Sequence, residues 1–405
     1  MSQLGFADLG MVAGNARRDR LGRIEQAIDW APVAALLSGL RQPGGGRLTR
    51  RWRCSGRFLL GQWHDLSDPA LEDALADRAS FRRFCGFSLD ARTPDETTLC
   101  RFRNALKEAG LGAALFEEVA RQLDERGYVL RKGTIIDATL IESAVRPPAS
   151  GSTLKGIESR SALDQDADWT RRGEGRRLFF GYKAHVAIDQ GSGLIRRRRL
   201  SGAKLYESEA AEDLICGDER AVYADKAYEK RARREALKAR RCKDRIQHRR
   251  HKHQPTLPRW QAVRNRLIAR VRGAVERLFS QLKGVYGMAR MRYRGLAANA
   301  LRLDLVAIAY NLRRAADLAV VKPARSGWAR RSRARPTEPK SHTKTLLQPL
   351  PANRTPFCRG LACGRGSHNP SINFAFCTAA PDAPLPRLSR RATSSAWPCA
   401  SLAKT

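Results

Sequence analysis

The sequence is poor in acidic residues relative to basic ones, and this imbalance excludes an ordinary charge-balanced surface. It contains 40 Asp and Glu against 76 Lys and Arg, a formal net charge of +36 over 405 residues. Solubility does not require so large an excess of one sign, so we expect a polyanionic partner, most simply DNA or RNA. The length allows two domains and a sizeable core.

Long apolar runs and regular cysteine spacings are also missing. No run reaches the length of a membrane span and no apolar signal core is present, so we expect a cytoplasmic protein without a membrane partner. The 9 cysteines are an odd number at irregular spacings, without a CxxC pair. This pattern supports neither a zinc site nor a disulfide framework, and buried thiols are the simpler interpretation.

Helical patterns dominate the first third of the chain. Asp68 followed by Pro69, and later Asp95 followed by Glu96, are typical helix starts, and amphipathic stretches follow both. We therefore expect a helical N-terminal domain over residues 1–127. Its charge suits contacts with phosphates, although a solvated helix face explains any single arginine equally well.

From Thr134 onward apolar residues recur about every 2 residues instead of every 3.6, and this change predicts strands. Asp137 lies inside the first apolar run, TIIDATLIES, and Asp225 ends a later one, AVYADKAYE. Between them a linker-like insert over 144–177 precedes two strands joined by Gln190-Gly191-Ser192-Gly193, a hairpin signal. With the helices that separate the later strands, this order predicts an α/β fold with a mixed sheet.

A proline-free stretch over 264–283 predicts a helix of about twenty residues. One apolar stripe is formed by Leu267, Val271, Val275, Leu278 and Leu282. Arg272, Glu276 and Lys283 follow the same spacing roughly a quarter-turn round the helix. Taken alone, this pattern also fits a salt-bridged surface helix.

Three carboxylates stand out: Asp137 and Asp225 on strands, and Glu276 on the late helix. Clustered carboxylates repel one another unless cations neutralise them, and oxygen ligands suit Mg²⁺ or Mn²⁺. Two such ions can activate a water or hydroxyl and stabilise the leaving oxygen of a phosphodiester. A strongly basic protein with this cluster is most simply a nucleic-acid cutting or strand-transfer enzyme, although acids at strand ends are common.

The chain resembles bacterial insertion-sequence transposases of the DDE type, in particular the IS-five group. The resemblance covers roughly residues 61–318 and rests on TIIDATLIES, GYKAHVAIDQGSGLI, VYADKAY and RVRGAVERLFSQLKGVYGMARMRYRGLAANALRLDLVAIAYNLRRA. It implies a ribonuclease-H-like catalytic domain, here 130–320, after the helical domain. It also implies that Asp137, Asp225 and Glu276 are catalytic and hold two Mg²⁺ or Mn²⁺ ions.

The same resemblance implies DNA-contacting residues. The family's Arg-x3-Glu-x6-Lys pattern falls on Arg272 and Lys283, whose alternative role is to neutralise Glu276. DNA-binding residues are also expected where cations flank Tyr293, because aromatic and basic residues interleave in nucleic-acid grooves. These cations are Arg290, Arg292 and Arg294. Simple solvation of the surface is an equal alternative for this group.

The implied function is that of a DNA transposase, which cuts insertion-sequence ends and joins them to target DNA by two-metal hydrolysis and transesterification. Its partners would be double-stranded DNA, as terminal inverted repeats and target, and a second copy of the chain in the synaptic complex. The alternatives are a decayed, catalytically silent DNA-binding copy and a metal-dependent endonuclease without strand transfer. The repeat, the target site and the oligomer are not readable from the sequence.

Two segments do not fit the pattern of the rest. Residues 321–405 carry 15 Lys and Arg against 2 Asp and Glu without apolar periodicity, so we expect a basic, disordered tail. It is either a DNA tether or, as we favour, the translation of codons past a lost stop. Residues 47–58, RLTRRWRCSGRF, occupy the position where the family has Pro-Tyr-Pro-Pro followed by an apolar helix. One permitted set of codons for these residues encodes that family-like sequence when it is read in the neighbouring reading frame. We expect this stretch to be out of frame and poorly packed.

Overall fold

The computed structural model describes residues 20–40, 56, 59–146, 163–172, 177–250 and 256–321, and all of them belong to one compact unit. The two segments predicted to be anomalous, 47–58 and 321–405, lie outside the described residues except for Gly56 and Val321. The expectations for both segments, and the predicted domain boundaries, therefore stay predictions.

A six-stranded mixed sheet forms the centre of the described chain, as the sequence predicts. The strands are β1 (Thr134–Glu142), β2 (Asp168–Arg172), β3 (Arg177–Asp189), β4 (Ile195–Gly202), β5 (Ala221–Ala224) and β6 (Lys243–Ile246). Their order is β2-β3-β1-β5-β6, with β4 paired to β3; β1 with β5 and β5 with β6 are parallel, and the other pairs are antiparallel. The segment 144–177 is not all linker, because β2 lies within it.

The predicted hairpin between β3 and β4 is confirmed. Gly191 and Gly193 both have positive φ, 110° and 74°, which glycine adopts without the steric cost that a side chain would add. The carboxylate of Asp189 accepts the hydroxyl of Ser192 at 2.7 Å and closes the turn. The same carboxylate accepts the main-chain N–H of Arg131 at 2.9 Å, so the turn also fixes the chain that enters β1.

Twelve helical elements in the described chain surround the sheet. They are α2 (Arg20–Glu25), α3 (Trp30–Leu36), η1 (Leu37–Gly39), α5 (Asp68–Asp77), α6 (Ala79–Phe84), α7 (Glu96–Glu108), α8 (Leu111–Glu125), α9 (Ala211–Leu214), η3 (Lys226–Tyr228), α10 (Arg231–Ala239), α11 (Arg259–Gly284) and α12 (Leu296–Val321). Asp95 caps α7 as predicted, but the cap of α5 is Ser67, one residue before the predicted Asp68. None of these helices combines the length and hydropathy of a membrane span.

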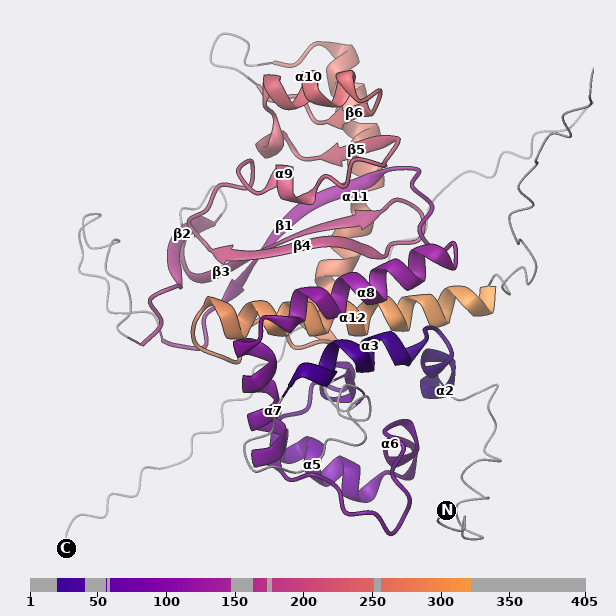
Figure 1. Ribbon diagram of the computed structural model, residues 1–405. Helices are drawn as coiled ribbons and strands as arrows, with labels where there is room; N and C mark the ends of the chain where they lie inside the picture. The colour runs from indigo at the N-terminus through magenta and orange to yellow at the C-terminus, as the bar shows by residue number, and fades with distance from the viewer. Residues whose placement is uncertain are drawn as a thin grey trace, which may run out of the picture. The chain divides into compact units, whose positions relative to one another are not determined.

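The helices pack on the two faces of the sheet around separate apolar cores. The smaller core joins β1 and β5 to α9, η3 and α10 through residues such as Ile136, Val222 and Leu237. The larger core joins the opposite face to α11, α12, α8 and the N-terminal helices. Figure 1 shows α12 between the sheet and the N-terminal helix α3, and the indole N–H of Trp63 donates to the carbonyl of Ala309 at 2.7 Å.

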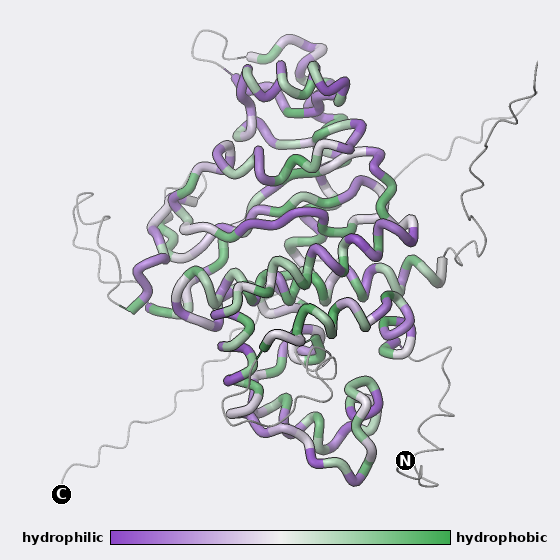
Figure 2. The backbone as a smooth tube through the Cα atoms, viewed as in Figure 1, coloured by the Kyte–Doolittle hydropathy of each residue, from purple (hydrophilic) through white to green (hydrophobic). Residues whose placement is uncertain are grey.

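Strand β4 contains four consecutive arginines, and Figure 2 shows it as a hydrophilic stretch within the sheet. Each arginine reaches an acid on a neighbouring element. Arg196 pairs with Asp218 at 2.5 Å, and Arg198 pairs with Asp304 of α12 at 2.8 Å while its guanidinium covers the ring of Phe116. Part of the positive charge is thus used within the fold rather than presented to a partner.

Helix α11 is longer than predicted and begins at Arg259. The second half of the predicted apolar stripe is buried, since Val275, Leu278 and Leu282 are at most 1% exposed. The first residue of the stripe is an exception, because Leu267 is 55% exposed. In the first half of α11 the neighbouring Ile268 is buried instead, at 2% exposed.

The buried His185 predicts a pH dependence of stability. Its ring has no exposed surface, and burial, with nearby Lys183, lowers its pKa from 6.5 to about 4. The unfolded chain binds this proton below pH 6.5 and the folded chain does not, so stability falls as pH falls from about 6.5 to about 4, by about 3 kcal/mol in total. We expect urea unfolding of His185→Gln to show a weaker pH dependence over this range. An identical dependence in both proteins would contradict the assignment.

A buried arginine of α12 holds the loop that follows α11. Arg302 is 1% exposed and donates to the carbonyls of Tyr286, Gly287 and Arg290 at 3.3, 3.0 and 3.1 Å. Burial lowers the pKa of Arg302 to about 10. Its five N–H groups suit several acceptors at once, which fixes the loop against the helix.

Replacing Arg302 with methionine should destabilise the protein. The substitution leaves three carbonyls without a hydrogen-bond donor, and this cost is larger than the gain from removing a buried charge. We expect the free energy of unfolding to fall by about 3 kcal/mol. Urea unfolding measures this loss. Arg270→Met, at an exposed position of α11, is the matched control and should change stability by less than about 0.5 kcal/mol. Equal stability of the two variants would show that the loop does not depend on Arg302.

Candidate active site at the ends of two parallel strands

The sheet places Asp137 and Asp225 next to each other. In the parallel pair β1–β5, Thr134 lies opposite Val222 and Ile135 opposite Tyr223. Continuing this register by two residues sets Asp137 opposite Asp225, where β5 has just ended. Asp225 follows the carboxyl end of β5, whereas Asp137 lies inside β1, which continues to Glu142. The carboxyl ends of parallel strands are the usual position of functional groups in α/β sheets, and Asp225 has that position.

The electrostatics agree with this placement. Burial raises the pKa of Asp137, Arg272 opposes the shift, and the negative charge of Asp225 adds to it. The side chain of Asp225 accepts the N–H of Lys226 and caps η3, so its carboxylate is held at the strand end. Two carboxylates brought together in this way favour a cation between them.

Helix α11 covers the pair and supplies a cation. The Nη2 atom of Arg272 donates to Oδ2 of Asp137 at 2.7 Å, and the two side chains are 11% and 14% exposed. The Nε atom of Arg272 is buried without a hydrogen-bond partner among the described residues. In the structure Arg272 therefore neutralises the carboxylate of Asp137. From the sequence, Glu276 was the acid that Arg272 would neutralise if it did not contact DNA.

The third predicted acid lies one turn further along the same helix. Glu276 is exposed on α11, four residues after Arg272, and no hydrogen bond or ion pair joins it to Asp137 or Asp225 in the described chain. Lys283 lies half-buried in the last turn of α11. The charges that shift the pKa of Asp137 are those of Arg272 and Asp225. The role of Glu276 stays a prediction.

The cations predicted around Tyr293 have partners within the protein. Arg290 donates to the carbonyl of Ser143 at 3.0 Å, and Arg292 to that of Leu66 at 2.7 Å. Arg294 is exposed. The structure thus uses Arg290 and Arg292 to hold the loop after α11 in place, and contact with DNA stays a prediction for all three.

Sequence reasoning missed three residues near the two acids. Glu207, in the turn after β4, has its pKa raised first by burial and then by Asp137 and Asp225, against the opposing charge of Lys183. Lys183 of β3 lies 3.9 Å from Glu207. Tyr228 of η3 is fully buried near the same carboxylates. The periodicity of the sequence does not mark Glu207 as part of a site, because Glu207 lies in a turn.

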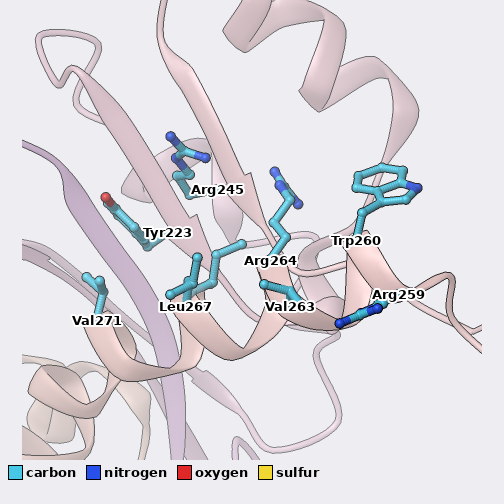
Figure 3. Close-up of a pocket in the computed structure, with 9 residues that line it drawn as sticks. Tyr223, Arg245, Arg259, Trp260, Val263, Arg264, Leu267 and Val271 are labelled. Carbon is cyan, nitrogen blue, oxygen red and sulfur yellow. The ribbon is translucent and has the colours of Figure 1, made fainter.

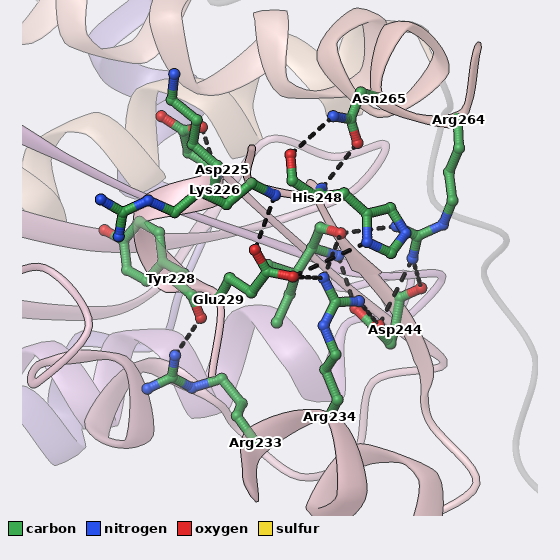
Figure 4. Close-up of polar contacts among 12 residues, drawn as sticks. Asp225, Lys226, Tyr228, Glu229, Arg233, Arg234, Asp244, His248, Arg264 and Asn265 are labelled. Atoms are coloured by element: carbon green, nitrogen blue, oxygen red, sulfur yellow. Dashed lines mark hydrogen bonds and ion pairs between the residues drawn. The ribbon is translucent and has the colours of Figure 1, made fainter. Parts of the chain in front are cut away.

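A polar network fixes the end of β5 to α11, as Figure 4 shows. Glu229, which follows η3, accepts from Arg234 at 2.9 Å, and Arg234 also pairs with Asp244 of β6. Arg264 of α11 donates to the carbonyls of Asp244 and Ile246 at 2.7 and 2.8 Å. The strand that ends at Asp225 and the helix that carries Arg272 are therefore held in one frame.

A groove of about 890 Å³ adjoins the site along the first half of α11. Figure 3 shows Arg259 and Trp260 at one end and Val271 at the other, where Tyr223 of β5 also lies. Trp260 and Leu267 are 61% and 55% exposed. Val271 precedes Arg272 in the chain and Tyr223 is two residues before Asp225, but Asp137, Asp225 and Arg272 do not line the groove themselves.

A second cluster of potential metal ligands lies at the opposite end of β5. The ligand atoms of Cys216, Asp218 and Glu219 are within 4.8 Å of one another, the only such group of three in the described chain. Arg131 and Arg196 pair with Asp218 at 2.7 and 2.5 Å. These guanidinium groups already supply positive charge, and a metal ion would have to compete with them.

The Asp137 and Asp225 pair offers a different set of donors, although Arg272 already pairs with Asp137. Both ligands are carboxylates, the donor type that Mg²⁺ and Mn²⁺ prefer. Near them the hydroxyl of Tyr228 is buried without a hydrogen-bond partner among the described residues, and such groups are normally satisfied. Fold and site together define a mixed α/β protein with an acidic site at the sheet edge, suited to a hard cation.

Two known protein families match parts of this chain. Residues 130–312 match the family described as transposase DDE domain, and residues 13–105 match the family described as transposase domain (DUF772). The chain is also similar, at 11% identity and a TM-score of 0.39, to a chain in the cryo-EM structure of a piggyBac transposase synaptic complex with hairpin DNA; the match covers 76% of this chain and 74% of that one. Two separate parts of the chain are thus similar to transposase domains, and the later part is similar to the DDE type.

Proposed function

We propose that the protein is a transposase of the IS-five group that cuts the ends of an insertion sequence and joins them to target DNA. The catalytic region would be a ribonuclease-H-like domain over 130–320, preceded by a DNA-recognising helical domain over 1–127. The observation that carries the proposal is the register of β1 and β5, which sets Asp137 opposite Asp225 beneath Arg272. The family matches over both segments support it.

Asp137 and Asp225 would hold the divalent ions, with Glu276 as the third ligand from α11. Two bound Mg²⁺ or Mn²⁺ ions supply Lewis-acid activation of a water or 3′-hydroxyl and stabilise the leaving oxygen. The protein's own residues orient the groups: Arg272 fixes the carboxylate of Asp137, and Lys226 donates to Asp225. Arg272 and Lys283, on the same helix as Glu276, would contact the scissile phosphate.

The groove along α11 provides a path for DNA to the site. Arginines and an exposed indole line it, a combination that suits phosphates and bases. The net charge of +36 supplies the long-range attraction. The partners would be double-stranded DNA, as terminal inverted repeats and as target, with a second copy of the chain bringing two ends together.

A strand-transfer assay tests the proposal. The full chain is incubated with Mg²⁺, a labelled duplex carrying the element's terminal repeat and a target plasmid, and products are resolved on a gel. We expect the labelled end joined to the plasmid. Cleaved ends without joined product would indicate a metal-dependent endonuclease, and retention of DNA without cleavage would indicate a silent DNA-binding copy; both results contradict the proposal.

A further inference from the structure

The turn before β5 carries a thiol and two carboxylates, at the end of the strand opposite Asp225. The ligand atoms of Cys216, Asp218 and Glu219 lie within 4.8 Å of one another. Gly217 between them has a φ of 95°, a left-handed conformation that glycine adopts without strain. The N–H of Gly217 donates to Oε2 of Glu219 at 2.8 Å. The conformation of this turn therefore holds the three side chains close together.

The carboxylate of Glu219 has an unsatisfied oxygen in this group. Its side chain is 1% exposed, and its Oε1 atom is buried without a hydrogen-bond partner among the described residues. The other oxygen, Oε2, accepts from Gly217 and lies 3.8 Å from Nη1 of Arg196. Buried carboxylate oxygens normally have a hydrogen bond or a cation. Oε1 therefore marks a place where a positively charged ligand would be stabilised.

The charges around the turn do not balance. Ion pairs join three carboxylates to two guanidinium groups, those of Asp124, Asp218 and Glu219 to those of Arg131 and Arg196. In addition, Oδ1 of Asp124 is a second buried oxygen without a partner in the described part of the chain. One negative charge is thus uncompensated, and a thiolate, the form in which cysteine binds metals, would make it two. A divalent cation would neutralise both.

The two arginines do not block the turn. Nε of Arg131 and Nη2 of Arg196 donate to the two oxygens of Asp218 at 2.7 and 2.5 Å. A carboxylate has about four lone-pair sites, and carboxylates that bind metals are themselves hydrogen-bonded by outer groups. The side chain of Asp218 is also 41% exposed, which leaves it open to a further ligand. Oε1 of Glu219 lies outside the competition with the arginines, because no described group donates to it.

Cys216 determines which class of ion fits. Its side chain and that of Asp218 line a cavity of about 380 Å³, through which the turn is reached. Mg²⁺ prefers oxygen ligands alone, whereas Zn²⁺ accepts cysteine sulfur together with carboxylate oxygen. Tetrahedral ligands at Zn²⁺ bond lengths are roughly 3.4–3.6 Å apart. A small closing movement of the three side chains would therefore bring them to coordinating distance.

We propose that Cys216, Asp218 and Glu219 bind a Zn²⁺ ion, with a water as the fourth ligand. On binding, the thiol of Cys216 loses its proton to solvent and Sγ bonds to the ion. Arg196, which donates to Asp218, also donates to the hydroxyl of Thr134 at 3.0 Å, so the ion would stabilise the starts of both β5 and β1. The site is independent of the proposed function, because it lies away from Asp225 and takes a different class of ion.

Titration of the full chain with Co²⁺ under reducing conditions tests the site. Co²⁺ occupies Zn²⁺ sites, and a bond between thiolate and Co²⁺ gives a charge-transfer absorption that reports a cysteine ligand. The titration is made on the wild type, Cys216→Ser and Glu219→Gln. Cys100→Ser, at a partly exposed cysteine of α7, is the matched control. Thermal midpoints establish that each variant is folded.

We expect the wild type and Cys100→Ser to show this absorption and Cys216→Ser to lose it. Glu219→Gln keeps the shape of the side chain but should weaken Co²⁺ binding by at least about tenfold, because even the outer partners of metal ligands contribute about 10–100-fold. Zn²⁺ should displace Co²⁺ and raise the thermal midpoint of the wild type more than that of Glu219→Gln. Excess Mg²⁺ should not displace Co²⁺, because one ligand is sulfur.

Three results would overturn the site. Absorption of equal strength in the wild type and Cys216→Ser, or none in the wild type, would show that Cys216 is not a ligand. Unchanged Co²⁺ affinity in Glu219→Gln would remove the second ligand, and this comparison decides if Cys216→Ser does not fold. Displacement of Co²⁺ by Mg²⁺ would contradict the class of ion. Each of these results leaves the proposed cleavage site at Asp225 unaffected.

Discussion

Replacing Asp225 with alanine should abolish DNA cleavage and leave DNA binding nearly intact. The substitution removes one of two adjacent carboxylates at the strand ends, and the remaining one, Asp137, is already paired with Arg272. We expect cleavage to fall by at least about 100-fold, because loss of a ligand should exceed the 10–100-fold effect of the partners that orient ligands. Binding should persist, because basic residues elsewhere supply most of the affinity.

The measurement is single-turnover cleavage of a labelled duplex at a protein concentration that saturates binding. Asp213→Ala is the matched control, since this aspartate is 58% exposed and pairs with Arg199 away from the strand ends. It should cleave like the wild type. Wild-type cleavage by Asp225→Ala would remove Asp225 from the site, whereas parallel loss of binding and cleavage would point to misfolding.

Removing residues 321–405 should flatten the salt dependence of DNA binding. The segment adds 15 Lys and Arg against 2 Asp and Glu, and cations that neutralise phosphates release counterions. A protein with six to ten phosphate contacts loses about 10³–10⁵ in affinity between about 50 and 200 mM salt. We expect the full chain to behave in this way and the shortened chain to have a clearly smaller slope.

Fluorescence anisotropy of a labelled duplex at several salt concentrations gives both slopes. Cleavage per bound complex should be unchanged by the truncation, because Asp137, Asp225 and Glu276 all lie before residue 321. If the truncation instead abolishes cleavage, the segment takes part in the chemistry and does not arise from translation past a lost stop.

Much of the fold could be predicted from local patterns. The alternating run around Asp137, the hairpin at Gly191 and Gly193, and the proline-free helix α11 all have strong local signals, and each is found. β2 was missed because its five residues follow a segment rich in proline, glycine and serine. The exposure of Leu267 was also missed, because periodicity shows which residues share a face of a helix but not where its partner ends.

The site was only half predictable. Asp137 and Asp225 stand out because acids interrupt or end apolar runs, where a charge needs a partner. Glu207 carries no such signal, since an acid in a turn is ordinary, and its contact with Lys183 is seen only in the structure. The pairing of Arg272 with Asp137 likewise depends on how α11 crosses β1.

That pairing joins residues 135 positions apart in the chain, and it sets when the site can form during synthesis. Asp137 and then Asp225 are synthesised before any residue of α11. Until Arg272 follows, the half-buried carboxylate of Asp137 lacks its guanidinium partner and β1 lacks the helix that covers it. A chain whose translation stops short of α11 therefore carries both aspartates but lacks the contact that joins Asp137 to Arg272.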